Sequence, residues 1–503
     1  MQSSWEAGSG KRTLHQSVYD VIIEGIQSGK WGEHERLPSV RQLAEEMQVH
    51  RLTVLKAYQR LQDEGVVVSK YKSGYFVAPA SQGPAGINRK EQAWTYRAKS
   101  QYIHRSRLSD IHRIPVEYQM SEALINPNLL PNAFLSNHVK QVFDKYPRVL
   151  STYSSVKGDP ELREELTHYF MQKQGISLHP EELMITTGSQ QAIDLISRAF
   201  VKSGDTILIE RPTYSPAIDV FVQQNVKIVP VEITPMGYDL DRLEQLMRDE
   251  KPSLFYMNPT FQNPTGYTVP VPQRKQLVEM AERYACILVE DEVYHDMYFG
   301  AMPPAPMFYY DTEGYVIHIR SFSKYVAPGL RISVLAARPE MMQAIVPVKA
   351  LSDNGTPLLT QKIFQQYFFS SRLQNHVAKL RTALELRKEK MEALLAPTGW
   401  KWNSPGGGLN LWVQLPETLS ADALLQRCLQ ASVAFVPGRI CDPLDAMDSW
   451  IRLSYSFIPE NRMEEGVGRL IAAALKINRG KGITLNEDFS IHNYYQYMVF
   501  EIQ

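Results

Sequence analysis

Lys324 is the residue whose setting first indicates chemistry. It lies in the stretch "SFSKYVAPGLRIS", residues 321–333, between two serines and an arginine and directly after the apolar run "YVIHIR". Ser321 and Lys324 form an S-x-x-K pattern, which is also the nucleophile pattern of penicillin-binding proteins and β-lactamases. That interpretation finds "SDN" at 352–354, but no downstream K-T-G and no export signal. A lysine after a strand-like run is otherwise most often an ordinary surface residue, so its neighbours must decide.

The neighbours favour a lysine that forms a Schiff base with pyridoxal phosphate. This cofactor needs a carboxylate at its pyridine nitrogen, a donor at its phenolic oxygen, an aromatic side chain on its ring, and a cation with hydroxyls at its phosphate. A helix N-terminus also suits a phosphate, and Gly188–Ser189–Gln190 lead from a strand-like run into a helical one. The remaining candidates, each at a strand end or beside the lysine, are Tyr214, Asn263, Asp291, Tyr294, Ser321, Ser323 and Arg331.

Short apolar runs alternate with helical patterns from about residue 117 to 480. The runs are "ELMITTG", "TILIE", "KIVPVEI", "LFYMNPT", "CILVEDEVY" and "YVIHIRSFSK". Strands separated by helices predict a mainly parallel sheet of the α/β class. From about 375 to 480, one long helix followed by hairpin-like pieces predicts a smaller C-terminal α+β lobe. The aromatic-rich residues 481–503 are interpreted as a tail.

This part of the chain, 117–480, resembles the fold-type I aminotransferases of the aspartate aminotransferase class. The resemblance implies that Lys324 binds pyridoxal phosphate as an aldimine. It also implies that Asp291 pairs with the pyridine nitrogen. Asn263 and Tyr294 would bind the phenolic oxygen of the cofactor.

The same resemblance extends to the ring face, the phosphate and a substrate carboxylate. Tyr214 would stack on the ring, and Arg452, in "WIRLSYS", would bind a substrate α-carboxylate with the two-pronged geometry of a guanidinium. The chain departs from the pattern at Ser333, where a glycine is usual. The residues assigned to phosphate are Ser189, Gln190, Ser321, Ser323 and Arg331, with Tyr153 reaching the phosphate of the neighbouring subunit.

Residues 1–79 predict three helices followed by a β-hairpin. Ser39 is a good N-cap for the second helix, and "VVVSKYKSGYFVA" has the pattern of the hairpin. With ten Lys and Arg against nine Asp and Glu in residues 1–78, charge leaves both a DNA-binding domain and a plain helical domain open. The apolar positions of the first helix are Leu14, Val18, Val21, Ile22 and Gly25, and those of the third are Val54, Ala57, Tyr58 and Leu61.

The stretch "GKWGEHERLPSVRQLAEEMQVHRLTVLKAYQRLQDEGVVVSKYKSGYFVA" closely resembles the winged helix-turn-helix of the GntR family of bacterial repressors. The matching elements are "G.W.....LPS.R.LA", the recognition helix "R.TV..AY..L..EG" and the wing "G.FV". His34 replaces a glycine that is usual three residues before the leucine of "LPS". The resemblance implies contacts to double-stranded DNA from Arg41, Arg51, Thr53 and Lys72.

Residues 80–116 connect the two parts and are predicted to be a basic linker. They hold seven Lys and Arg and two Asp and Glu, a net of five positive charges. The segment is interpreted as solvated, with contact to DNA phosphate or docking on the large domain as the alternative.

Composition limits the remaining possibilities. The formal net charge is zero, with 44% hydrophobic and 21% charged residues, so any binding of nucleic acid must be local. Three scattered cysteines form no metal-ligand pattern and suit a reducing cytosol. No signal peptide or membrane-length apolar run is present, which predicts a cytoplasmic protein without a membrane or metal partner.

The order of the two parts resembles the MocR/GabR family of transcription regulators. That resemblance implies a homodimer that binds paired operator half-sites. It also implies that a small amine or amino acid is sensed when it displaces Lys324 as an external aldimine. Two alternatives remain: a sensor of pyridoxal phosphate itself that controls vitamin B6 genes, and a catalytically active aminotransferase with a vestigial DNA-binding domain.

Overall fold

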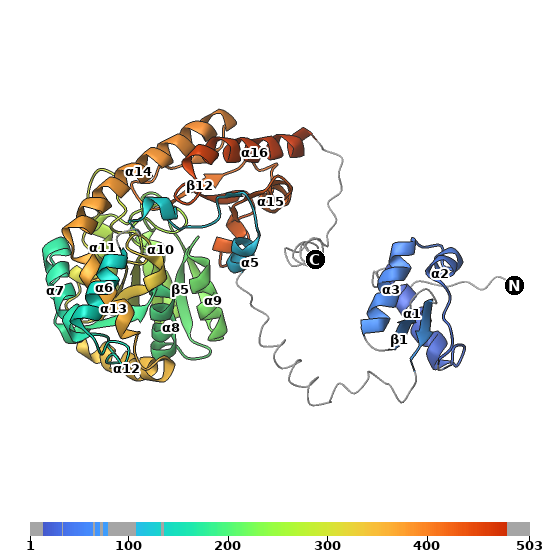
Figure 1. Cartoon of the computed structure of the whole chain (residues 1–503), viewed down its shortest axis with the longest axis horizontal. Helices are drawn as coiled ribbons and strands as arrows, with labels where there is room; N and C mark the ends of the chain where they lie inside the picture. Colours follow the sequence, from blue (N-terminus) through green and yellow to red (C-terminus); the bar gives the residue numbers. More distant parts are fainter. Residues whose placement is uncertain are drawn as a thin grey trace. The chain divides into compact units, whose positions relative to one another are not determined.

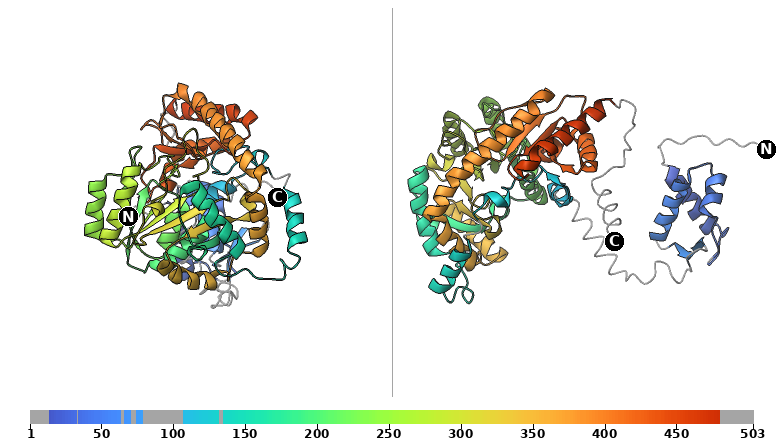
Figure 2. Two further views of the ribbon diagram at one scale, coloured as in Figure 1. Left: turned by 90° about the vertical axis from the view of Figure 1, so that its left-hand side faces the viewer. Right: turned by 45° about the horizontal axis from the view of Figure 1, so that its top comes forward.

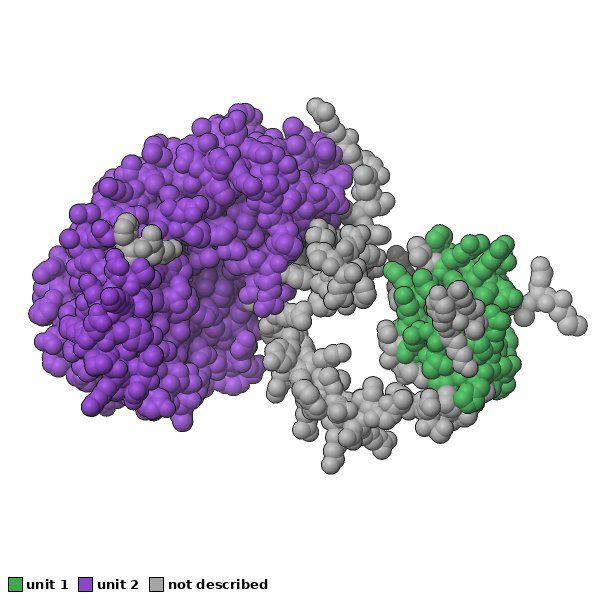
Figure 3. All heavy atoms as spheres, in the orientation of Figure 1, with its two compact units in different colours: residues 1–103 green, residues 104–503 purple. Residues whose placement is uncertain are grey.

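The computed structural model describes residues 14–32, 34–63, 66–70, 74–78, 107–131 and 135–479. Two compact units divide the chain, residues 1–103 and residues 104–503 (Figure 3). Among the described residues, no helix has both the length and the apolar character needed to cross a bilayer.

The first unit has the predicted three helices and β-hairpin. Ser39 caps the second helix: its hydroxyl accepts from the Gln42 backbone N–H, and the Gln42 side chain accepts from the Ser39 N–H. This reciprocal capping confirms the predicted helix start. The elements are α1 (Leu14–Gln27), α2 (Val40–Glu46), α3 (Arg51–Asp63), β1 (Val67–Lys70) and β2 (Gly74–Val77), with the two strands antiparallel.

The apolar face predicted for the third helix forms the centre of this unit. Val54, Ala57, Tyr58 and Leu61 are fully buried in one cluster with residues of α1. The Tyr58 hydroxyl donates to the Pro38 carbonyl at 2.6 Å, and its ring stacks on Tyr75 of β2 with centroids 4.4 Å apart. Tyr58 therefore joins α3 both to the start of α2 and to the hairpin.

Two positions in this unit differ from the sequence-based picture. Val21, assigned to the apolar face of the first helix, is 39% exposed, because Val18 and Ile22 occupy the middle of that face. His34 has a φ of 63°, the left-handed conformation that glycine adopts without steric cost. This left-handed backbone conformation explains why the GntR pattern usually has a glycine at this position.

A seven-stranded sheet is the frame of the second unit (Figure 1). Strand β10 runs antiparallel to both neighbours, β4 and β9, while the other neighbouring pairs are parallel. The six apolar runs picked out in the sequence all form strands, and β10 was not among them. In spatial order the strands are β4 (Leu183–Thr187), β10 (Ile332–Ala336), β9 (Val316–Ser321), β8 (Ile287–Glu292), β7 (Leu254–Met257), β5 (Thr206–Arg211) and β6 (Lys227–Glu232).

Helices cover both faces of this sheet, because successive strand residues point to opposite sides. In β8, Leu288 belongs to one apolar cluster and Val289 to the other. One face packs against α8 (Ser189–Phe200), α9 (Ser215–Gln223) and α12 (Pro339–Ser352). The other packs against α7 (Pro160–Gln174), α10 (Leu240–Glu250), α11 (Val271–Tyr284) and α13 (Leu358–Phe368), with α6 (Leu135–Lys145) beside α13.

The smaller lobe is an antiparallel sheet with long helices (Figures 1 and 2). The long helix predicted near residue 375 begins at Ser371. Its strands, in spatial order, are β11 (Lys401–Trp402), β12 (Asn410–Gln414), β15 (Trp450–Ser454) and β14 (Val436–Pro437). Its helices are α14 (Ser371–Leu395), α15 (Ala421–Gln430) and α16 (Glu460–Arg479).

The predicted linker, 80–116, is wrong at its C-terminal end. Residues Arg107–Arg113 form helix α5, and Leu108 and Ile111 are buried in the core of the second unit. Strand β3 (Tyr118–Gln119) then pairs in parallel with β13 (Val433–Ala434) of the small lobe. The many basic residues of this segment led to the prediction of a linker, although helix α5 also has an apolar face that packs against the second unit.

Several predictions fall outside the described residues. These are the wing residue Lys72, the tail at 481–503 and the part of the linker before residue 107.

The buried face of α3 sets the stability of the first unit. We expect Leu61→Ala to lower its free energy of unfolding by about 2–5 kcal/mol, because the truncation leaves a cavity in a fully buried site. Chemical denaturation of the isolated residues 1–103 would measure this. Gln59→Ala, on the exposed face of the same helix, is the control, and an equal effect of the two changes would contradict the packing described.

Candidate cofactor site

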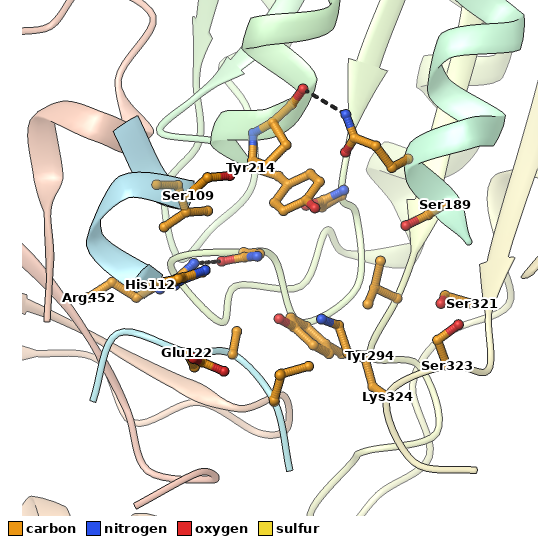
Figure 4. A pocket seen from close by; sticks show the side chains of 18 of the residues that line it. Ser109, His112, Glu122, Ser189, Tyr214, Tyr294, Ser321, Ser323, Lys324 and Arg452 are labelled. Carbon is orange, nitrogen blue, oxygen red and sulfur yellow. Dashed lines mark hydrogen bonds between the residues drawn. The ribbon is translucent and has the colours of Figure 1, made fainter. Parts of the chain in front are cut away.

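A cavity of about 260 Å³ opens at one edge of the large sheet (Figure 4). Strands β4, β5, β7, β8 and β9 all end at this edge, since β4 and β9 are both antiparallel to β10 and the rest are parallel. The carboxyl ends of such strands are where α/β sheets bind their ligands.

The structure brings together the predicted cofactor and carboxylate-binding residues. All of them line the cavity except Tyr153 and Asp291, and the backbone carbonyl of Asp291 accepts from the side chain of Asn258, which does line it. Ser189, Ser321 and Ser323 lie at one end of the view in Figure 4, and Arg452 lies at the other. Lys324 and Tyr294 lie between these two ends.

Lys324 lies in a cavity whose other cations depress its basicity. Its amine has neither a hydrogen bond nor an ion pair with any described residue. Burial, followed by the charges of Arg331 and Arg452, lowers the pKa of the Lys324 amine from its usual 10.5 to about 8. A larger share of this lysine is therefore unprotonated and nucleophilic near neutral pH than of an ordinary lysine.

Asp291 is a buried carboxylate with one unsatisfied oxygen. It is 1% exposed, and its Oδ2 accepts from the Tyr256 hydroxyl at 2.8 Å. Its Oδ1 has no hydrogen-bond partner among the described residues. Burial raises the pKa of the Asp291 carboxyl to about 7. Such a group is suited to pair with a cationic N–H that enters the cavity.

Gly188, Arg331 and the start of α8 form a cradle for an anion. Gly188 precedes α8 with a φ of 83°, and a Cβ atom there would clash with Nη2 of Arg331. Only glycine therefore lets this guanidinium approach the helix N-terminus. Backbone N–H groups, a guanidinium and nearby hydroxyls are the donors that bind phosphate.

Ser333, which departs from the glycine usual in the pattern that this chain resembles, has a definite partner. Its hydroxyl donates to Ser321 Oγ at 3.0 Å, and both side chains are buried. The Ser323 hydroxyl donates to the Ile332 carbonyl at 3.1 Å. These bonds orient two of the hydroxyls that line the cavity.

Arg452 is a buried cation that pairs with no carboxylate among the described residues. It is 2% exposed; Nη1 donates to Asn263 Oδ1 at 3.1 Å and Nη2 donates to the Ser121 carbonyl. Its Nε has no partner among the described residues. A guanidinium held this way attracts an anion, since burying an uncompensated charge is costly.

Sequence reasoning missed several residues that line the cavity, three of which are polar and come from the segment before residue 125. Ser109 and His112 come from α5, and Glu122 comes from the segment after β3. The apolar spacing of Leu108 and Ile111 could have identified α5 as part of the domain. Glu122 could not be predicted as a site residue from the sequence, because it is part of no recognisable motif.

Tyr153 is not part of this cavity. Its side chain is 90% exposed. Its predicted role concerned the phosphate of a neighbouring subunit, which the single chain does not test.

The residues predicted to contact DNA are at least partly exposed on the surface of the first unit, as far as the structure describes them. Arg41 is exposed and paired with Glu45 at 3.1 Å. Arg51, the first residue of α3, is exposed, and Thr53 is half-buried. The N-terminal turn of α3 therefore presents side chains that can donate to DNA.

The residues present fit pyridoxal phosphate. The cavity offers a nucleophilic lysine and an anion cradle at one end, and Asp291 nearby has a buried carboxylate oxygen without a partner among the described residues. Tyr214 supplies an aromatic ring, and burial raises the pKa of the Tyr294 phenol to about 12, which keeps it a hydrogen-bond donor. Each chemical part of the cofactor thus has a matching group.

The lowered pKa of Lys324 has a measurable consequence. In cofactor-free protein, labelling of Lys324 by trinitrobenzenesulfonate should rise with pH and level off above about 8, because only the neutral amine reacts. Peptide mass spectrometry would follow the labelled lysine, and exposed Lys379 in the same sample would serve as reference. Arg452→Gln removes a nearby positive charge and should move the midpoint to higher pH. A Lys324 profile that coincides with that of Lys379 would contradict the assignment.

Comparison with known proteins agrees with this geometry. The model of the family "Aminotransferase class I and II" matches residues 126–470, and that of "Bacterial regulatory proteins, gntR family" matches residues 14–77. The 2-aminoadipate transaminase of Thermus thermophilus is 35% identical over 68% of this chain and 86% of its own length. The HTH-type transcriptional regulator YdfD of Bacillus subtilis is 26% identical, over 92% of this chain and 96% of its own.

The fold of this chain is also similar to that of a solved aminotransferase structure. The α-aminoadipate aminotransferase LysN of Thermus thermophilus, complexed with N-(5'-phosphopyridoxyl)-L-leucine, superposes with a TM-score of 0.71 and 30% identity. The match covers 77% of this chain and 99% of that one. The cofactor of the large domain is accordingly pyridoxal phosphate. The chain belongs to the aminotransferase class I and II family and, with its GntR winged helix, is a DNA-binding transcription regulator of the MocR type.

Proposed function

We propose that this regulator senses a small amine or amino acid in the cofactor cavity and changes its binding to DNA in response. The observation that carries this proposal is the buried, unpaired Arg452 in the same cavity as Lys324. A regulator that needed only to hold the cofactor would have no use for a second anion-binding group beyond the phosphate cradle. An α-carboxylate at Arg452 would leave the amine of the same ligand beside Lys324.

In this proposal the cavity residues hold the cofactor as follows. Lys324 bonds covalently to it, and Asp291 Oδ1 pairs with its ring nitrogen. Asn263 and Tyr294 bind its phenolic oxygen, and Tyr214 stacks on its ring. The phosphate would be held by Ser189, Gln190, Ser321, Ser323 and Arg331.

The cofactor supplies a carbonyl carbon with which primary amines condense. When bound, it would let a primary amine take the place of Lys324, with nothing oxidised or reduced. The released Lys324 would be available to take up the proton that the incoming ammonium gives up. The low pKa of the Lys324 amine would favour its release, because it is a weaker base than an ordinary lysine.

The proposed form is a homodimer that binds paired half-sites. A two-fold dimer would present two winged helices, which suits an operator with two copies of its sequence. The exposed ring of Tyr153 is available to reach the partner subunit, as the family pattern implies.

A working aminotransferase is the second candidate function. The observation in its favour is the likeness to aminotransferases over about two thirds of the chain, together with a cavity lined by most of the groups proposed to bind the cofactor. Repeated turnovers with an amino acid and a 2-oxo acid would support it. A sensor of pyridoxal phosphate itself would instead show DNA binding that depends on cofactor and ignores amines.

Arg51 at the start of α3 is expected to contact the operator. Arg51→Ala should weaken operator binding by about 1–3 kcal/mol at moderate salt, because a base or phosphate contact is lost. Fluorescence anisotropy with labelled DNA would measure it, and cofactor uptake should stay unchanged. Arg242→Ala, an exposed arginine of the large unit, is the charge-matched control. Equal affinities for wild type and Arg51→Ala would contradict this placement of α3.

Lys324 is expected to be the covalent attachment point. Lys324→Ala should abolish the cofactor adduct that borohydride traps in wild type, while DNA affinity without effector stays within about twofold, since the two units fold separately. Intact-mass spectrometry after reduction would detect the adduct. Lys379→Ala is the control at an exposed lysine. A trapped adduct in Lys324→Ala would show that another lysine binds the cofactor.

A further inference from the structure

Glu122 stands out among the residues that line the cavity. Among the described lining residues it is the only carboxylate, and it makes no hydrogen bond or ion pair with any described residue. Burial raises the pKa of the Glu122 carboxyl and the charge of Lys324 opposes this, yet the two side chains form no ion pair. If Lys324 bonds to the cofactor, that positive charge is engaged and Glu122 keeps an unsatisfied negative charge.

The other cations of the cavity are already matched to anions. Arg331 lies at the phosphate cradle beside Gly188, and Arg452 suits an α-carboxylate. Figure 4 shows Glu122 on the same side of the cavity as Arg452 and His112, away from Ser321 and Ser323. Glu122 therefore faces the part of the cavity left for the effector.

His112 adds a second acceptor at this end. Its Nε2 lies 3.2 Å from the Ser121 carbonyl oxygen, which can only accept, so Nε2 carries the proton. Burial, followed by the charge of Arg452, lowers the pKa of His112 to about 4, so the ring is neutral near pH 7. Nδ1 is then an acceptor, and no described residue donates to it.

Apolar side chains lie beside these acceptors. Leu108, Ala123 and Leu124 line the same cavity. A ligand that satisfies the whole set has an apolar chain that ends in a cationic hydrogen-bond donor. An ammonium group on a short methylene chain has both properties.

We propose that Glu122, with His112, binds a cationic group at the far end of the effector, so that the effectors are diamino carboxylic acids and not acidic or purely apolar amino acids. This inference rests on the proposed sensing of amines in the cavity. It names the class of ligand that the cavity selects.

L-Ornithine and L-norvaline test the proposal, because they have the same carbon chain and differ only in the second ammonium. Titration of the full-length, cofactor-loaded protein, followed by the visible absorbance of the bound cofactor and by calorimetry, gives both dissociation constants. We expect ornithine to bind at least about tenfold tighter than norvaline, the effect of one hydrogen-bonded charge. L-Glutamate should bind more weakly than norvaline, and L-2,4-diaminobutyrate and L-lysine report the preferred chain length.

The matched variants assign the preference to one side chain. In Glu122→Gln the ratio of the two dissociation constants should fall toward one. Glu117→Gln is the control: its carboxylate binds Arg462 at 3.0 Å on the surface, so the ratio should stay as in wild type. Because the readout is a ratio within one protein, partial loss of stability does not imitate the result. Glu122→Asp, which keeps the charge, should retain part of the preference.

The outcomes separate this inference from the function on which it rests. If no amino acid binds while cofactor and operator still bind, amine sensing itself is wrong. If norvaline or glutamate binds as tightly as ornithine, amine sensing stands and the cationic specificity is overturned. A preference for ornithine that survives in Glu122→Gln also overturns the proposal. Equal weakening of both ligands in that variant would make Glu122 a proton acceptor for the incoming amine instead.

Discussion

Unpaired charge at the carboxyl edge of the large sheet is the constraint on which the rest of this structure depends. Within the part of the chain that the structure describes, Arg452 is buried without a carboxylate partner, and Asp291 keeps an oxygen without a donor. Burying an uncompensated charge costs several kcal/mol, so a fold keeps such groups only where a ligand neutralises them. A zwitterionic cofactor bearing a phosphate, together with a carboxylate-bearing amine, would complement these groups. Burial, followed by the charges of Arg331 and Arg452, lowers the pKa of the Lys324 amine and so prepares it to exchange partners.

A buried ionic network beside the cavity holds these groups in place. Arg320, at the end of β9, pairs with Asp296 at 2.7 Å, and Glu292, at the end of β8, pairs with His295 at 2.9 Å. The hydroxyl of Tyr325, the residue after Lys324, donates to Asp296. These contacts anchor Glu292, the residue after Asp291, and Tyr325, the residue after Lys324. In this network Arg320 and His295 each meet a carboxylate, whereas Arg452 in the cavity pairs with no carboxylate of the described residues.

The sequence predicted those features that a local pattern encodes. The strand-like runs and the residues that follow them identified the edge of the sheet, and the periodicity of Val54, Ala57, Tyr58 and Leu61 identified the buried face of α3. It could not show that α5 belongs to the cavity, because the contact of that helix with the domain is non-local and its basic residues suggested a linker. Glu122 lies in no motif, and only the cavity reveals that it lacks a partner.

The most direct test of the account is whether occupancy of the cavity changes binding to DNA. Affinity of the full-length protein for DNA upstream of its own gene would be measured without cofactor, with pyridoxal phosphate, and with cofactor plus L-ornithine. We predict that the amine changes the affinity by roughly fivefold or more, the usual scale of coupling between two sites. The change should vanish in Lys324→Ala. Selective DNA binding that stays the same in all conditions, with amine demonstrably bound, would contradict the claim that the two units communicate.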